Sequence, residues 1–157
     1  GGAKKGGGGG GGGGVADILD SLPRQDISKK LSAKVLDQYN HKDWKVRKKC
    51  GDDIEAILKE AKMRIEPNGT NELMDVMKKA MKDANKAVVK GIIILLGMLA
   101  EAMGTPISKY QKKCFVPMLS NLSDKQALVR DEVIKCMNKW ADAIGAEKVI
   151  NHLGEVI

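Results

Sequence analysis

This chain of 157 residues has little of several residue types that common functions need. Aromatic residues make up 3% of it, and it has four arginines. Proteins that read nucleic acids use arginines and exposed aromatic rings that stack on bases, so the composition argues against that class. Cys50, Cys114 and Cys136 are odd in number and far apart, which is typical of reduced thiols in a cytosolic protein rather than of disulfides.

Long apolar runs and recognisable catalytic or metal patterns are also missing. The longest apolar run, 91–100, has about half the length that a bilayer span requires, so we expect no membrane segment. No charged-then-apolar signal peptide opens the sequence. The two histidines and three cysteines lack the spacing of a metal site, and no Ser–His–acid or paired-carboxylate arrangement can be assigned. We therefore expect no catalytic residues, no metal, no cofactor and no enzymatic activity.

Glycine is concentrated at one end of the chain. Eleven of the 18 glycines lie in residues 1–14, together with Lys4 and Lys5. This composition predicts a flexible linker with almost nothing to bury. A phosphate-binding loop is the alternative, but no strand precedes the glycines and no Gly-Lys-Ser/Thr follows them. We assign 1–14 to a linker and 15–157 to one folded domain.

An apolar residue followed by a base recurs along the domain, at Val46-Arg47, Val89-Lys90 and Val129-Arg130. The spacings of about 43 and 40 residues predict stacked helical hairpins, an architecture that presents loops to a partner. Apolar residues at helical spacing and turn residues between them predict seven helices. They form hairpins at about 27–64, 70–104 and 105–145 and the start of a fourth at 146–157. The fold class is therefore an all-α solenoid of about three and a half repeats.

Local signals predict how these helices begin, bend and pack. Asp43 and Thr70 are suited to cap the helices that follow them. The helix after 83–85 is apolar on nearly all sides and should be the most buried. The helix that follows Thr105-Pro106 should be interrupted near Pro117, and the next should begin at Ser123 or Asp124. Trp140 falls within the apolar stripe of that helix and is predicted to lie in the core.

A basic ridge is predicted where the hairpin loops line up. Trp44 lies about 110° from the centre of its helix's apolar stripe, so it should be exposed and suited to bind a partner. The alternative is that it covers the apolar end of the first hairpin. Equivalent loops of stacked hairpins lie about 10 Å apart. We define the predicted loop ridge by six residues: Lys42, Trp44, Lys45, Asn85, Lys86 and Lys125. With a net charge of +7, it favours an acidic partner, although lysines can also form a solvated face.

The repeat resembles the HEAT family. Asp124, Val129 and Arg130 stand in the order that announces the second helix of a HEAT hairpin, and Pro117 matches the proline of its first helix. In that family the base and the loop aspartate tie neighbouring repeats together. The resemblance thus implies a structural ladder in which Arg47, Lys90 and Arg130 pair with Asp83 and Asp124.

A longer resemblance, from Asp20 to the end, indicates a particular group within the HEAT family. The segments 43–47 (Asp-Trp-Lys-Val-Arg), 20–28, 61–67, 83–86 and 100–104 are similar to TOG domains of the XMAP215-type microtubule polymerases, the fourth domain above all. The likeness covers the N-terminal half of such a domain, which has six repeats. It implies that the loops bind the tubulin heterodimer or the microtubule lattice. It also implies that the Trp44 side chain packs on the acidic surface of tubulin.

The same resemblance implies where the protein works and with what. It predicts one module that acts with other TOG domains in cis, in a cytoplasmic protein of microtubules, spindle and centrosome. Two alternatives stay open. One is a HEAT adaptor for another acidic protein, which would not depend on Trp44. The other is a solenoid that binds nucleic acid or an anionic surface, for which steep salt dependence is the test.

Overall fold

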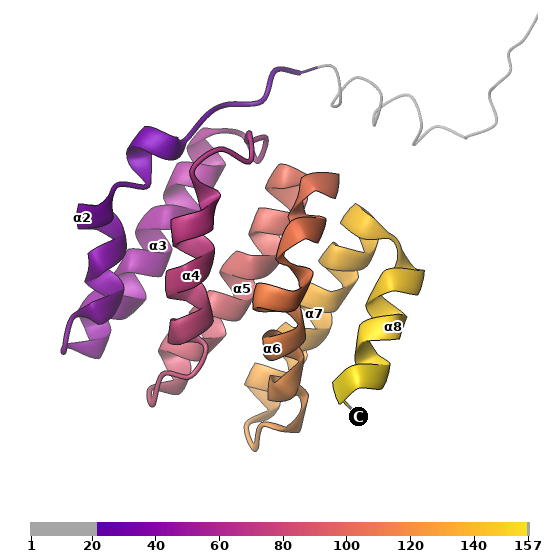
Figure 1. Cartoon of the computed structure of the whole chain (residues 1–157). Coiled ribbons are helices and arrows are strands. Elements are labelled where there is room, and N and C mark those ends of the chain that lie inside the picture. The colour runs from indigo at the N-terminus through magenta and orange to yellow at the C-terminus, as the bar shows by residue number, and fades with distance from the viewer. Residues whose placement is uncertain (1–21, 157) are drawn as a thin grey trace, which may run out of the picture.

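The computed structural model describes residues 22–156, and this part of the chain is a stack of helical hairpins in two layers (Figure 1). The predicted linker 1–14 and the start of the predicted domain lie outside the described residues. No strand occurs within 22–156, where the only bridge joins Gln25 and Ile65. The predicted all-α solenoid is therefore confirmed.

Three long helices form one layer: α3 (Trp44–Glu60), α5 (Lys86–Met103) and α7 (Ala127–Ile144). α5 packs between α3 and α7. It is the most apolar helix and twelve of its residues are buried, as predicted. Gly104 ends it at φ +74°, a conformation that side-chain-bearing residues rarely adopt.

The other layer is made of shorter and less regular helices (Figure 1). Its elements are η2 (Ser28–Lys30), α2 (Ala33–Leu36), η3 (Asp37–Asn40), α4 (Thr70–Ala80), η4 (Thr105–Tyr110), η5 (Gln111–Phe115), α6 (Val116–Leu119), η6 (Ser120–Ser123) and α8 (Ala146–Val156). The core lies between the layers. Trp140 is fully buried there, with its ring 4.6 Å from that of Phe115, which confirms its predicted core position.

The first hairpin differs from its prediction at both helices. The expected single helix over 27–39 is divided into η2, α2 and η3, because the Ser32 hydroxyl accepts a hydrogen bond from the Val35 N–H and starts a new helix. The second helix begins after Asp43 as predicted but ends at Glu60 instead of near Arg64. Lys62 and Met63 have positive φ angles of 57°, which turn the chain away.

The second hairpin begins with a glycine rather than with the predicted threonine cap. Gly69, at φ +75°, precedes α4, and Thr70 is the first residue of the helix. The Thr70 side chain is buried, where its hydroxyl donates to the Pro67 carbonyl and lies 2.7 Å from the Tyr110 hydroxyl. Thr70 therefore fastens α4 to the next hairpin instead of capping α4.

The third hairpin is interrupted before Pro117, as predicted. A 3-10 segment, η4, passes into a π-helical segment, η5, before α6. Proline donates no backbone hydrogen bond and its ring crowds the preceding turn, so a widened turn at this point is expected. α7 then starts at Ala127, later than the predicted Ser123 or Asp124, because Asp124 has extended backbone angles and its carboxylate accepts from the Gln126 N–H.

The loop ridge as a candidate binding site

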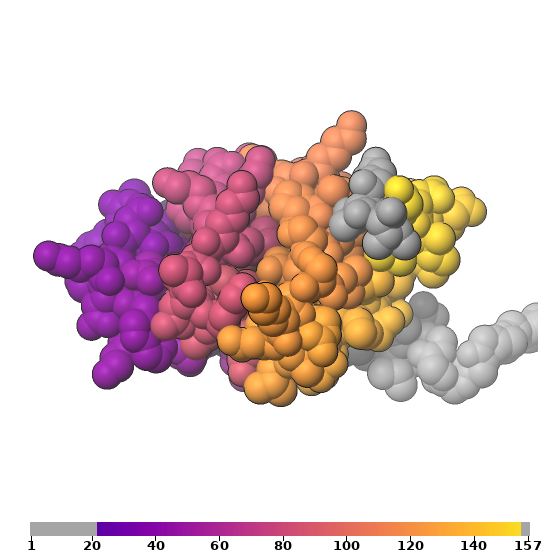
Figure 2. All heavy atoms as spheres, turned by 90° about the horizontal axis from the view of Figure 1, so that it is seen from below, coloured from indigo at the N-terminus to yellow at the C-terminus, as the bar shows by residue number. Residues whose placement is uncertain are grey.

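The loops inside the three hairpins lie along one edge of the solenoid (Figure 1, lower edge). They are 41–43 before α3, 81–85 before α5 and 124–126 before α7. Figure 2 looks onto this edge and shows the hairpins side by side, from the indigo first hairpin to the orange third. The structure therefore brings the six residues of the predicted loop ridge to one face of the molecule.

The first loop is held by one capping aspartate and one arginine. Asp43 caps α3 as predicted, with its carboxylate accepting from the Lys45 N–H at 2.9 Å. The Arg47 guanidinium donates to the carbonyls of His41 (2.7 Å) and Lys42 (3.1 Å). These bonds fix the backbone on either side of Trp44, so the tryptophan starts from a rigid position.

Arg47 also joins the first loop to the second. Its guanidinium makes two hydrogen bonds to the Asp83 carboxylate, at 2.7 and 3.0 Å. The two side chains are 17% and 10% exposed. Burial raises the pKa of Asp83, but the bonds from Arg47 and from the Asn85 N–H outweigh it and hold the pKa below its usual value. This pair confirms the predicted contact between Arg47 and Asp83.

The second loop is joined to the third by a lysine. Asn85 caps α5, with its side-chain oxygen accepting from the N–H groups of Ala87 and Val88. The Lys86 ammonium lies 2.6 Å from the Asp124 carboxylate, and this bond lowers the pKa of Asp124 together with the Gln126 N–H. Two predicted binding residues, Asn85 and Lys86, are thus engaged within the protein itself.

The predicted ladder is wrong at Lys90, which makes no ion pair among the described residues, since Lys86 takes Asp124 instead. The base stands four residues after the capping position in α3 and α7, but five residues after Asn85 in α5. One residue turns the side chain by about 100° around the helix. The position equivalent to Arg47 is therefore occupied by buried Val89.

The third loop repeats the first. Arg130 donates to the carbonyls of Asp124 (2.7 Å) and Lys125 (3.0 Å), the residues six and five positions before it, as Arg47 does in its own loop. The third base therefore holds its own loop by backbone contacts. Its predicted pairing with an aspartate side chain is replaced by a bond to the Asp124 backbone.

Four predicted binding residues remain available on the loop ridge. Trp44 is 38% exposed at the first position of α3. Lys42, Lys45 and Lys125 are exposed, and their ammonium groups have no ion pair within 22–156. The loop ridge thus combines one accessible aromatic ring with three unpaired positive charges.

Sequence reasoning missed one residue of this face. Leu128, at the second position of α7, is 65% exposed, the most of any large apolar side chain that the structure describes. It lies about 130° from the centre of the α7 apolar stripe, by the helical arithmetic that singled out Trp44. The exposure of Leu128 could therefore have been predicted from the sequence.

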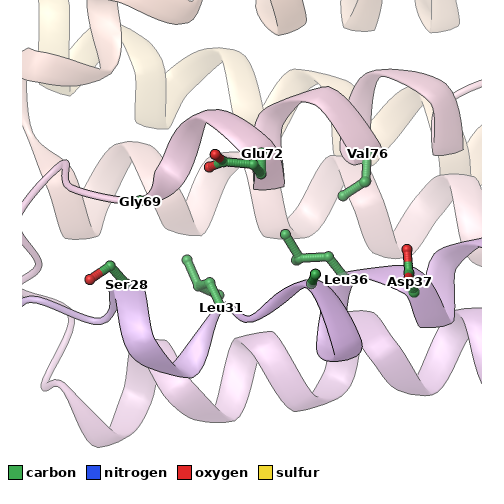
Figure 3. Close-up of a pocket in the computed structure, with 8 residues that line it drawn as sticks. Ser28, Leu31, Leu36, Asp37, Gly69, Glu72 and Val76 are labelled. Carbon is green, nitrogen blue, oxygen red and sulfur yellow. The ribbon is translucent and has the colours of Figure 1, made fainter.

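The described surface has hollows both on the loop ridge and away from it. One, of about 520 Å³, lies between α2 and α4, away from the loop ridge, and the side chains of Leu31 and Leu36 point into it toward α4 (Figure 3). Another, of about 430 Å³, lies on the loop ridge beside Lys86 and Lys125. Burial raises the pKa of the Cys50 and Cys114 thiols to about 12, which makes them poor nucleophiles.

The described part of the chain, 22–156, has neither a metal-binding cluster nor a membrane-spanning helix. No group of three or more His, Cys, Asp or Glu side chains in this part could hold a metal ion. None of its helices is long and apolar enough to cross a membrane.

A stack of hairpins with loops on one edge, joined by an arginine–aspartate pair between repeats, defines a HEAT-type α-solenoid. No protein-family model matches the chain. Protein MOR1 of Arabidopsis thaliana is 33% identical over 135 residues, and Protein mini spindles of Drosophila melanogaster is 27% identical over 129 residues. These alignments cover 86% and 82% of this chain but only 7% and 6% of the relatives, so the chain spans a small fraction of their length.

Solved structures agree on the fold. A structure from a study of microtubule plus end tracking by XMAP215, CLIP-170 and EB1 superposes with a TM-score of 0.75, at 22% identity over 88% of this chain and 58% of that one. A structure from a study of microtubule polymerases with TOG domain arrays gives 0.71, at 16% identity over 89% and 30%. The chain belongs to the TOG domains of the XMAP215 family.

Proposed function

We propose that this chain is a tubulin-binding module that uses its loop ridge. The observation that carries the proposal is Trp44, exposed at the start of α3 between the unpaired lysines Lys42 and Lys45. Tryptophan is among the commonest binding hot spots, because a large ring gains much contact area at little entropic cost. Arg47 holds the adjoining backbone, so little ordering is required when a partner binds.

The related proteins supply the identity of the partner. One solved neighbour comes from a study of tubulin recruitment and assembly by microtubule polymerases. An acidic tubulin surface would be attracted by Lys42, Lys45 and Lys125, mainly through faster encounter and with sensitivity to salt. We place the protein with the microtubule cytoskeleton, including spindle and centrosome, as the names of its relatives suggest.

In a longer protein this module would act together with other TOG domains. Tethered binding modules raise one another's effective concentration, to an extent set by the linker between them. Growth of the microtubule end would then follow from local delivery of tubulin rather than from chemical catalysis. The likeness to a fourth domain of such an array remains a prediction.

The charge distribution favours a protein partner over nucleic acid. Arg47 and Arg130 both donate to loop carbonyls, and Lys86 is paired with Asp124. The loop ridge therefore offers point charges around an apolar ring rather than a continuous basic track for a phosphate backbone. A HEAT adaptor for a different acidic protein is the second candidate, and it differs by not requiring Trp44.

The test compares binding of purified tubulin by the whole chain and by Trp44→Ala. The wild type should co-elute with tubulin at low salt, and the variant should bind at least about tenfold more weakly. Ile150→Ala, which removes another exposed apolar side chain, on α8 in the other layer, is the control and should bind normally. Absence of wild-type binding at millimolar sensitivity contradicts the function. Unchanged binding by Trp44→Ala contradicts the site.

A further inference from the structure

Directly after the third loop of the ridge, α7 presents the exposed apolar side chain of Leu128. Leu128 is 65% exposed at the start of α7, two residues after Gln126 and three after Lys125, both of which are exposed. Trp44 has a similar setting at the start of α3, between Lys42 and Lys45. Each end of the described ridge therefore presents one accessible apolar group beside positive charge.

The middle of the ridge is different. The first two residues of α5 are Lys86 and Ala87. Lys86 is paired with Asp124, whose side chain is 7% exposed, and alanine offers little apolar surface. The charge of Lys86 is thus neutralised within the protein, and the two apolar groups lie on either side of this ion pair. α5 lies between α3 and α7, and packed helices generally lie about 8–10 Å apart, so we expect Trp44 and Leu128 to be separated by roughly 20 Å.

We propose that Leu128 is a second apolar anchor for the acidic protein surface that Trp44 contacts. This inference rests on the proposed function and takes tubulin as the occupant. The loop ridge then binds at two points, Trp44 and Leu128. The ion pair of Lys86 with Asp124 joins the second loop to the third and helps to hold the two points at a fixed separation. Charge complementarity supports the assignment, because each apolar group has nearby in the chain an exposed lysine that makes no ion pair within 22–156, and these lysines attract the same acidic surface.

Position distinguishes Leu128 from other exposed apolar residues. Ile134, on the same helix, is 50% exposed. It lies about 9 Å further along the axis and is rotated by about 120° from Leu128 around it, so it faces away from the loop ridge. Ile134 is therefore a matched control that tests whether apolar exposure alone matters or whether its place on the ridge does.

The experiment measures tubulin affinity for the whole chain and for Leu128→Ala, Leu128→Gln, Ile134→Ala and Trp44→Ala, with urea unfolding of each to verify the fold. Both Leu128 variants should weaken binding about three- to tenfold, mainly by faster dissociation. Ile134→Ala should stay within about twofold of the wild type. Combining Leu128→Ala with Trp44→Ala should multiply the two losses, because sites this far apart act independently.

Each outcome bears on a separate claim. If Trp44→Ala weakens binding while both Leu128 variants match the wild type, the second anchor is refuted and the proposed function stands. If Ile134→Ala weakens binding as much as Leu128→Ala does, position on the ridge has no role and the inference is also overturned. If the wild-type chain does not bind tubulin, the proposed function fails, and the second anchor fails with it.

Discussion

Removing Arg47 should destabilise the domain more than any other change to a surface charge on the loop ridge. Arg47→Ala deletes two bonds to Asp83 and two to loop carbonyls. It also leaves the Asp83 carboxylate, 10% exposed, with the Asn85 N–H as its remaining hydrogen-bond donor among the described residues. Breaking a fully buried ion pair costs about 3–5 kcal/mol. Because this pair lies at the edge of the stack and can admit water, we expect a loss of about 2–3 kcal/mol.

A double-mutant cycle in urea isolates the pair itself. Arg47→Ala, Asp83→Ala and the double variant should give a coupling energy of about 1–2 kcal/mol. The control is the cycle for Lys48 and Asp52, an exposed pair one helical turn apart, which should give no more than about 0.5 kcal/mol. Equal coupling in the two cycles would refute the view that Arg47 and Asp83 join neighbouring repeats.

Three further predictions concern the stability of the fold that carries the loop ridge, all measured by urea unfolding. Asn85→Ala should lower the free energy of unfolding by about 1 kcal/mol, because the α5 amides lose their cap, whereas Asn85→Asp should retain most of that stability. Equal losses for the two variants would contradict the capping role. Gly104→Ala should cost about 1–3 kcal/mol at φ +74°, whereas Gly91→Ala, in open space within α5, should stabilise by about 0.5–1 kcal/mol. The lowered pKa of Asp83 contributes stability above its unfolded-state pKa of about 3.9 that is lost as the pH falls through its folded-state pKa. The stability gap between wild type and Asp83→Asn should therefore shrink below about pH 4, and a constant gap would contradict this.

Local sequence signals were sufficient where one residue decides the structure. The cap at Asp43, the end of α5 at Gly104 and the interruption before Pro117 depend on backbone geometry that the residue itself imposes. Trp140 in the core followed from helical periodicity. These features require no knowledge of the neighbouring hairpin.

Predictions failed where the neighbouring hairpin decides. Thr70 is a residue type that often caps helices, but its hydroxyl instead makes a hydrogen bond with the hydroxyl of Tyr110 in the third hairpin. Lys90 corresponds to Arg47 in the sequence motif. One additional residue between the cap and Lys90 rotates the Lys90 side chain away from the position of Arg47, and Lys86 pairs with Asp124 instead. The loop ridge itself was predicted as a set of exposed side chains. The ion pair of Lys86 with Asp124 was not predicted, because it depends on how adjacent repeats stack.

The affinity of the whole chain for tubulin, compared between wild type and Trp44→Ala at low salt, tests the central claim most directly. Trp44 is 38% exposed and lies at the end of a rigid loop, so its loss should leave the fold intact and weaken binding at least about tenfold. Equal affinity of the two proteins for tubulin would contradict the account.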